Sequence, residues 1–117
     1  MYRGVDIPKE LVAASATPLV LSILTGGESY GYAIIQKVRE LSDGRLEWTD
    51  GMLYPILHRL EKQGLVRSSW RESESGRKRK YYRIREAGRG ALVAQSQQWN
   101  AVNEALQAAW GGRLGHV

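Results

Sequence analysis

The sequence predicts a mainly α domain of the α+β class, with one long helix added at its C-terminal end. Three observations predict this class. Apolar residues recur at helical spacing in three segments of the first 63 residues. They then alternate with polar residues in two short runs between residues 65 and 85. From residue 86 to residue 110 they return to helical spacing, with a repeat close to seven residues.

The first helix is expected from the Asp6-Ile7-Pro8 entry to about Thr25. Asp6 is a possible N-cap, and a proline is tolerated in the first turn of a helix. Pro18 interrupts the apolar pattern in the middle of this segment. Either the helix kinks at Pro18, or Thr17 caps a new helix with Pro18 at its first position, and the sequence allows both.

A second helix is expected over residues 30–41, with Ser29 as its N-cap. Ile34 and Val38 lie on one face of this helix, because residues four apart are neighbours on a helical surface. The run Ser42-Asp43-Gly44 is expected to end it.

A third helix is expected over residues 50–63, with Thr49 as its N-cap and Gly64 at the left-handed position that ends it. Its inward stripe consists of Leu53, Ile56, Leu57 and Leu60. Pro55 lies well inside this segment, where it removes a hydrogen bond and crowds the preceding turn. We therefore expect a helix that is bent or that starts late.

The two alternating runs, 65–72 and 77–85, predict a hairpin with a turn at Ser73-Glu74-Ser75-Gly76. Trp70 is expected to pack within this hairpin, and Tyr82 is expected to share one side of the second strand with Ile84. Three helices followed by a hairpin is the order of a winged helix-turn-helix. We call the hairpin the wing, and we assign residues 1–85 to this domain.

The last predicted helix, residues 86–110, carries apolar residues in a heptad pattern that Gln95 interrupts. The residues expected to form a dimer seam are Leu92, Trp99, Val102 and Leu106. A core helix of the same domain is the alternative. We favour a seam between two copies of the chain, because the preceding elements already supply a small core. Residues 111–117 are expected to form a flexible tail.

The positive charge of the chain is concentrated in one segment. The net charge is +5 overall, but residues 67–89 alone carry +6, from nine Lys or Arg and three Glu. A local basic block of this kind indicates a polyanionic partner, here double-stranded DNA, although a solvated charged face is the simpler alternative. No apolar run approaches the roughly 18 residues of a membrane helix. The chain has no cysteine, which is compatible with the cytoplasm, where we expect it to act.

A recognition helix reads bases by placing polar side chains on the edge of the major groove, while wing cations contact the backbone. The residues expected to contact DNA are Tyr54, His58, Arg59, Lys62, Arg77, Lys78, Arg79 and Lys80. Arg59 suits a guanine edge but can equally bind a phosphate. Tyr54 can instead pack against the wing, and His58 can be a solvated surface residue.

One motif typical of a catalytic site occurs, since Gly27-Glu28-Ser29-Tyr30-Gly31 fits the G-x-S-x-G pattern of serine hydrolases. That pattern functions on a strand-to-helix turn of a large α/β sheet, for which this chain is too short. The histidines and carboxylates form no recognisable metal-ligand set. We therefore expect no enzyme activity, no metal and no cofactor.

Three stretches resemble the PadR-type transcriptional regulators: Ser29–Tyr32, Leu53–Leu65 and Glu72–Tyr82. The single C-terminal helix with Trp99 resembles the short, multidrug-sensing (LmrR-like) branch of this family. The resemblance implies a homodimeric repressor that leaves DNA when a small aromatic or cationic ligand binds. Met52 departs from the family, which commonly has a small hydroxyl residue there.

Two copies related by a two-fold axis are expected to bind a pseudo-palindromic operator. Trp99 and its symmetry mate are expected either to sandwich a planar ligand or simply to anchor the interface. The alternative function is a winged-helix module that binds protein or RNA and responds to no small molecule.

Overall fold

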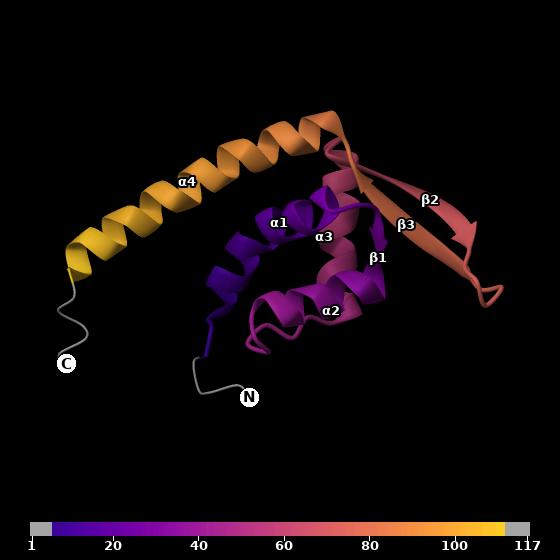
Figure 1. The fold of residues 1–117 in the computed structure, drawn as a ribbon, viewed down its shortest axis with the longest axis horizontal. Helices are drawn as coiled ribbons and strands as arrows, with labels where there is room; N and C mark the ends of the chain where they lie inside the picture. The colour runs from indigo at the N-terminus through magenta and orange to yellow at the C-terminus, as the bar shows by residue number, and fades with distance from the viewer. Residues whose placement is uncertain (1–5, 112–117) are drawn as a thin grey trace.

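The computed structural model describes residues 6–111, and it confirms the predicted α+β class. Its elements, in chain order, are α1 (Lys9–Thr25), β1 (Ser29–Tyr30), α2 (Gly31–Leu41), α3 (Asp50–Lys62), β2 (Val66–Glu72), β3 (Lys78–Ile84) and α4 (Glu86–Trp110). The first three helices form the body of the molecule (Figure 1). The wing, made of β2, β3 and the turn between them, projects from one end, and the far end of α4 lies at the other.

One hydrophobic core joins the three helices of the body to the inner side of the wing. The apolar side chains of these elements are removed from water, which is the main favourable contribution to folding. The buried residues are Ala16, Val20, Leu21, Leu24, Ile34, Val38, Trp48, Leu53, Leu57, Leu60, Val66, Tyr82 and Ile84. The core therefore fixes α3 and the wing relative to one another.

Helix α1 runs through Pro18 as one continuous helix, so the second alternative, a new helix capped by Thr17, is wrong. The prediction of its start was wrong, because the helix begins at Lys9 with Pro8, not Asp6, in the N-cap position. The backbone carbonyl of Pro8 accepts hydrogen bonds from the amides of Leu11 and Val12. These two bonds hold the first turn without a side-chain cap.

The sheet has three strands in the order β1-β3-β2, and all neighbours are antiparallel. The sequence did not predict β1. Ser29, expected to cap α2, instead pairs with Tyr82 of β3, and Tyr30 occupies the N-cap position without a side-chain cap bond. A strand of two residues is stable only because β3 lies beside it, so no local pattern could reveal it.

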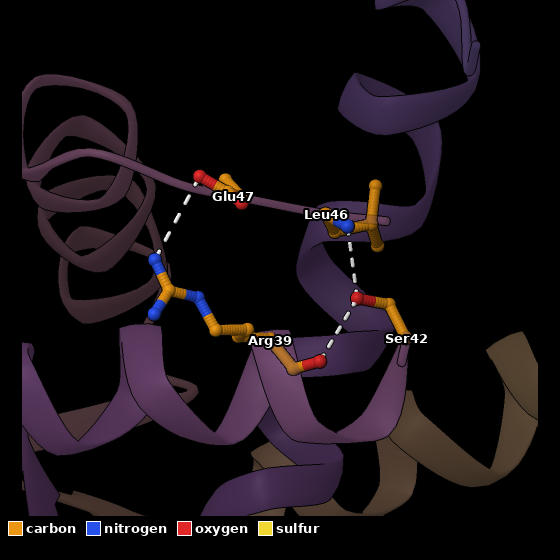
Figure 2. A network of polar contacts seen from close by, with 4 residues as sticks. All are labelled: Arg39, Ser42, Leu46 and Glu47. Carbon is orange, nitrogen blue, oxygen red and sulfur yellow. Dashed lines mark hydrogen bonds and ion pairs between the residues drawn. The ribbon is translucent and has the colours of Figure 1, made fainter. Parts of the chain in front are cut away.

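The connection between α2 and α3 is held by a small polar network, which Figure 2 shows. The amide of Leu46 donates to Ser42 Oγ at 2.8 Å, and Ser42 Oγ donates to the carbonyl of Arg39 at 3.3 Å. The Arg39 guanidinium lies 3.7 Å from the Glu47 carboxylate. The network ends at Glu47, and the next residue, Trp48, is buried in the core.

The ends of α3 are where the sequence places them. Thr49 Oγ1 accepts a hydrogen bond from the amide of Met52, which confirms the predicted N-cap. Gly64 has φ +78°, and the Leu65 amide donates to the carbonyl of Leu60, as in a Schellman C-cap. Of the two alternatives for Pro55, a bent helix or a late start, the late start is wrong, because the helix begins at Asp50 and continues through Pro55.

Helix α4 has the predicted bounds, and it packs on the body through its first half. A Cβ at Gly88 would lie 2.2 Å from the carbonyl oxygen of Leu65, so only glycine allows this close approach. Beyond that contact the helix continues past α1 (Figure 1). Its apolar residues there are exposed, with Val102 at 55% and Leu106 at 42%.

Within residues 6–111 no helix is long and apolar enough to cross a membrane. The predicted tail at 111–117 lies, from residue 112 onward, outside the described residues.

Candidate nucleic-acid interface

A groove runs between the start of α2, the outward side of α3 and the wing. From α3 it receives Tyr54 and His58, whose rings lie 6.5 Å apart. From the wing it receives the four consecutive cations Arg77, Lys78, Arg79 and Lys80. The structure thus brings together six of the eight residues that the sequence predicts to contact DNA.

The wing cations occupy two sides of β3. Lys80 Nζ lies 5.6 Å from the ring centre of Tyr82 and 5.9 Å from that of Trp70, on the side toward α3. The Arg79 guanidinium lies 4.0 Å above the ring of Tyr30. Stacking on an aromatic ring restrains a cation while leaving its N–H groups free to meet an anion. The wing therefore presents cations whose positions are partly fixed in advance.

Tyr54 is held at the edge of the groove by α2. A Cβ at Gly31 would lie only 2.4 Å from Tyr54 Oη, so glycine is needed for the tyrosine to lie against the first turn of α2. The tyrosine is half-buried there, whereas His58, one turn later, is exposed. Tyr54 thus links the two helices and also faces the wing.

The floor of the groove contains a tyrosine whose hydroxyl is buried. Tyr82 Oη has no hydrogen-bond partner among the described residues. Burial, together with the nearby charge of Glu61, raises the pKa of Tyr82 from 10.0 to about 12. Beside it, Ser68 Oγ donates to Glu61 Oε2 at 2.6 Å and so joins β2 to the last turn of α3.

Two predicted DNA contacts lie outside the groove. Arg59 belongs to the side of α3 that faces α1, where its Nη2 donates to Thr17 Oγ1 at 2.8 Å. On that side it borders an apolar depression with Met52 and Trp48. Lys62, near the C-terminal end of α3, is exposed and does not line the groove.

The groove also contains residues that the sequence analysis did not predict. Tyr30 enters from β1, Tyr32 from the first turn of α2, and Asp50 from the start of α3. Trp70, expected to pack within the wing, lies there beside Lys80, but it is 64% exposed and also lines the groove, which the sequence did not predict. It lies near the tip of β2, beyond the reach of the core. The Ser-Tyr-Gly-Tyr run was the available signal for the tyrosines, since its glycine marks a close approach.

Trp99 lies elsewhere, in a shallow groove between α1 and α4 that Pro18 and Leu19 border from the α1 side. It is 39% exposed. Leu92, one of the four predicted seam residues, packs against the core of the same chain. Among residues 6–111 no three His, Asp or Glu side chains come close enough to hold a metal ion.

This geometry, a three-stranded sheet whose β2-β3 wing lies beside an exposed helix of a helix-turn-helix, is a winged-helix DNA-binding fold. The family model "Transcriptional regulator PadR-like family" matches residues 20–94. The chain therefore belongs to the PadR-like family, whose members are transcriptional regulators rather than enzymes.

Individual relatives agree with this assignment. Transcriptional regulator Rv3488 of Mycobacterium tuberculosis is 34% identical over 105 residues, which are 90% of this chain and 92% of Rv3488. Transcriptional regulator YqjI of Escherichia coli is 30% identical over 77% of this chain, but the match spans only 42% of YqjI. A transcriptional regulator from Clostridium thermocellum has a TM-score of 0.78 at 27% identity, covering 86% of this chain and 97% of that one.

Proposed function

We propose that the chain is a homodimeric, DNA-binding repressor of transcription that acts in the cytoplasm and is released by a small aromatic or multidrug-type ligand. The observation that carries DNA binding is the groove. It combines four wing cations with the Tyr54 and His58 side chains of an exposed helix. The cations suit the phosphate backbone, and the helix side chains suit base edges in the major groove.

Arg59 and Lys62 have separate roles in this proposal. Lys62 extends the positive charge of α3 beyond the groove and is free to meet a phosphate. Arg59 must give up its bond to Thr17 before it can reach DNA. We therefore assign base reading to Tyr54 and His58 before Arg59.

The exposed half of α4 supports a dimer. Val102 and Leu106 are exposed, and Trp99, which lies three and seven residues before them on the same side of α4, is 39% exposed. An apolar stripe on a helix is stabilised by burial against a second helix, and a second copy supplies one with the same stripe. A two-fold dimer presents two wings, and so we expect pseudo-palindromic half-sites about one helical turn apart or a multiple of that.

DNA binding of this kind depends strongly on salt. If the dimer neutralises about six phosphates, log affinity falls with log salt concentration at a slope near −5.

The test replaces Arg77 and Arg79 together with alanine and measures fluorescence anisotropy with a duplex that the wild-type protein selects from a random-sequence pool. We expect a large loss of affinity and a smaller salt slope, because phosphate contacts are removed. The matched control is Arg39→Ala/Arg45→Ala, which removes the same charge at the far end of α2. Undiminished affinity of the Arg77/Arg79 variant contradicts DNA binding by the wing. It would favour a module for protein or RNA binding.

The ligand proposal rests on Trp99. A planar aromatic cation between two tryptophans gains stacking and cation–π attraction of about 0.5–2 kcal/mol. The test titrates a planar cationic dye and follows tryptophan fluorescence in the wild type and in Trp99→Ala. We expect quenching that the variant loses, and release of the selected duplex as the dye binds. Equal quenching in both proteins removes Trp99 from the site.

A further inference from the structure

The outer face of the sheet, which points away from the core, carries four arginines. Side chains alternate between the two faces of a strand, so Arg67 and Arg83, which pair across β2 and β3, lie on the face opposite Val66 and Ile84. Arg71 and Arg79 form the next arginine pair of this face toward the wing tip. We call Arg67, Arg71, Arg79 and Arg83 the outer arginine face. None of them except Arg79 borders the groove.

Two of these arginines lie over tyrosine rings. The Arg71 guanidinium lies 4.0 Å above Tyr81, and that of Arg79 lies 4.0 Å above Tyr30. The two rings meet edge to face with centres 5.6 Å apart. The tyrosine rings are thus covered by guanidinium groups and offer little free surface on which a base could stack. The guanidinium groups over these rings carry N–H donors that are suited to carboxylate and phosphate groups.

The face already binds one anion, the carboxylate of Glu28. Arg71 Nη2 donates to Glu28 Oε2, and the Arg83 guanidinium lies 3.7 Å from Glu28 Oε1. The Glu28 side chain is 29% exposed, less than either arginine. Glu28 pairs with two of the four arginines and adds one negative charge to a face with four positive charges, so the face keeps a positive excess. It borders a small depression between Arg67 and Arg83.

We propose that the outer arginine face is a second phosphate-binding surface, which holds the backbone of a second DNA duplex while the groove holds the first. Glu28 occupies part of this surface in the free protein and must be displaced when a phosphate binds. The inference rests on the proposed DNA binding by the groove. It adds a new property, the bridging of two DNA segments by one regulator.

The second duplex is distinct from the first because the two faces of the sheet point in opposite directions. We expect a straight duplex along α3 and the inner side of the wing to leave Arg67 and Arg83 free, because neither of them lines the groove. Bending one short duplex around the wing requires a sharp deformation, which DNA resists over lengths well below its persistence length of about 150 base pairs. The separate faces therefore fit two segments better than one.

A two-colour capture assay tests this. The full-length chain is bound to an immobilised duplex, the one selected from a random-sequence pool, and is then exposed to a second, fluorescent duplex of unrelated sequence. Retention of the protein reports the groove, and retention of the second duplex reports the outer face. If the protein is not retained, the proposed function fails. If the protein is retained but the second duplex is not, only the present inference fails.

Variants test whether retention of the second duplex depends on the outer arginine face. Arg67→Ala/Arg83→Ala is expected to bind the immobilised duplex as the wild type does and to lose most of the second duplex. Glu28→Gln removes the ion pairs of Glu28 with Arg71 and Arg83 and is expected to raise second-duplex capture about two- to fivefold, since ion pairs near the surface contribute little each. Arg39→Ala/Arg45→Ala, with the same charge loss at the far end of α2, is expected to behave as the wild type.

Two further outcomes overturn the proposal. In the first, the Arg67/Arg83 variant captures the second duplex as well as the wild type does. The two grooves of a dimer, and not the outer face, would then bridge the two duplexes. The other is a Glu28→Gln variant whose capture is unchanged or lower, because Glu28 then does not compete with phosphate. Folding of each variant is checked by its thermal transition, and these exposed arginines lie outside the core.

Discussion

The two outward sides of α3 differ although they belong to one helix. On the side toward the wing, Tyr54 and His58 face a groove that four cations complete. On the side toward α1, Arg59 is bonded to Thr17 and borders an apolar depression. The difference teaches that exposure on a helix does not define a binding surface. The neighbouring elements decide which exposed side carries a function.

This comparison predicts which cations matter most for DNA binding. Lys78→Ala/Lys80→Ala on the wing side is expected to lower affinity for the selected duplex by at least about 100-fold, since the dimer loses four phosphate contacts. Lys9→Ala/Arg59→Ala on the α1 side removes the same charge and is expected to cost less than about tenfold. Anisotropy at one fixed salt concentration measures both. Equal losses would show that α3 contacts DNA from both sides.

Tyr82, on the floor of the groove, predicts a pH dependence of the free energy of unfolding. Because the pKa of Tyr82 rises to about 12 in the folded chain, the folded state keeps its proton at pH values where the unfolded state has lost it. The stability that this proton provides is present below pH 10 and is lost as pH rises toward 12. The loss is roughly 2–3 kcal/mol.

Urea denaturation of the wild type and of Tyr82→Phe between pH 9 and about pH 12 measures this loss. Phenylalanine removes the unpartnered hydroxyl and keeps the ring, so the variant is expected to lose less stability over this range. Parallel pH profiles for the two proteins would show that ionisation of Tyr82 does not change the free energy of unfolding.

Two glycines near α3 are expected to respond differently to substitution, because only one of them is closely packed. Gly31→Ala forces a Cβ toward Tyr54 Oη and is expected to cost about 1–3 kcal/mol of stability. Gly51→Ala meets no atom closer than Thr49 Oγ1 at 3.8 Å, and is expected to be neutral or stabilising by about 0.5–1 kcal/mol.

Tyr54→Phe removes the hydroxyl oxygen, which is the atom nearest to the new Cβ. The double variant is therefore expected to recover part of the stability that Gly31→Ala alone loses. Urea denaturation of the four proteins forms a double-mutant cycle. Strict additivity would mean that Gly31 and Tyr54 are not in contact.

The smallest effect is expected at the contact of Arg59 with Thr17. Arg59→Ala is expected to lower the free energy of unfolding by about 0.5–1 kcal/mol, because one exposed hydrogen bond is lost. Thr17→Val is expected to cost about the same, and the double variant no more than either single one. Fully additive losses would show that Arg59 stabilises the fold through some other contact.

Local signals predicted most of the fold. The N-cap at Thr49, the glycine at Gly64 and the alternation in the wing each depend on residues close in sequence, and each is confirmed. The heptad pattern likewise predicted the bounds of α4. Strand β1 was missed because Ser29 acquires its role only by pairing with Tyr82, which lies far along the chain.

The candidate site was predicted less completely, for the same reason. Helical periodicity identified Tyr54, His58 and Arg59 as outward residues but could not tell which of them faces the wing. That depends on the angle at which α1 and the wing pack against α3, which is set by contacts between distant segments. Trp70 shows the same limit, since alternation gave its side of the strand but not its exposure.

The central claim, that the wing side of α3 faces DNA, has a direct test because the chain contains no cysteine. His58→Cys and Arg59→Cys each introduce one thiol, on opposite sides of α3. The rate of thiol labelling is measured with and without the selected duplex. We predict that DNA slows labelling strongly in the His58→Cys protein and little in the Arg59→Cys protein. Equal protection, or stronger protection at position 59, would contradict the account.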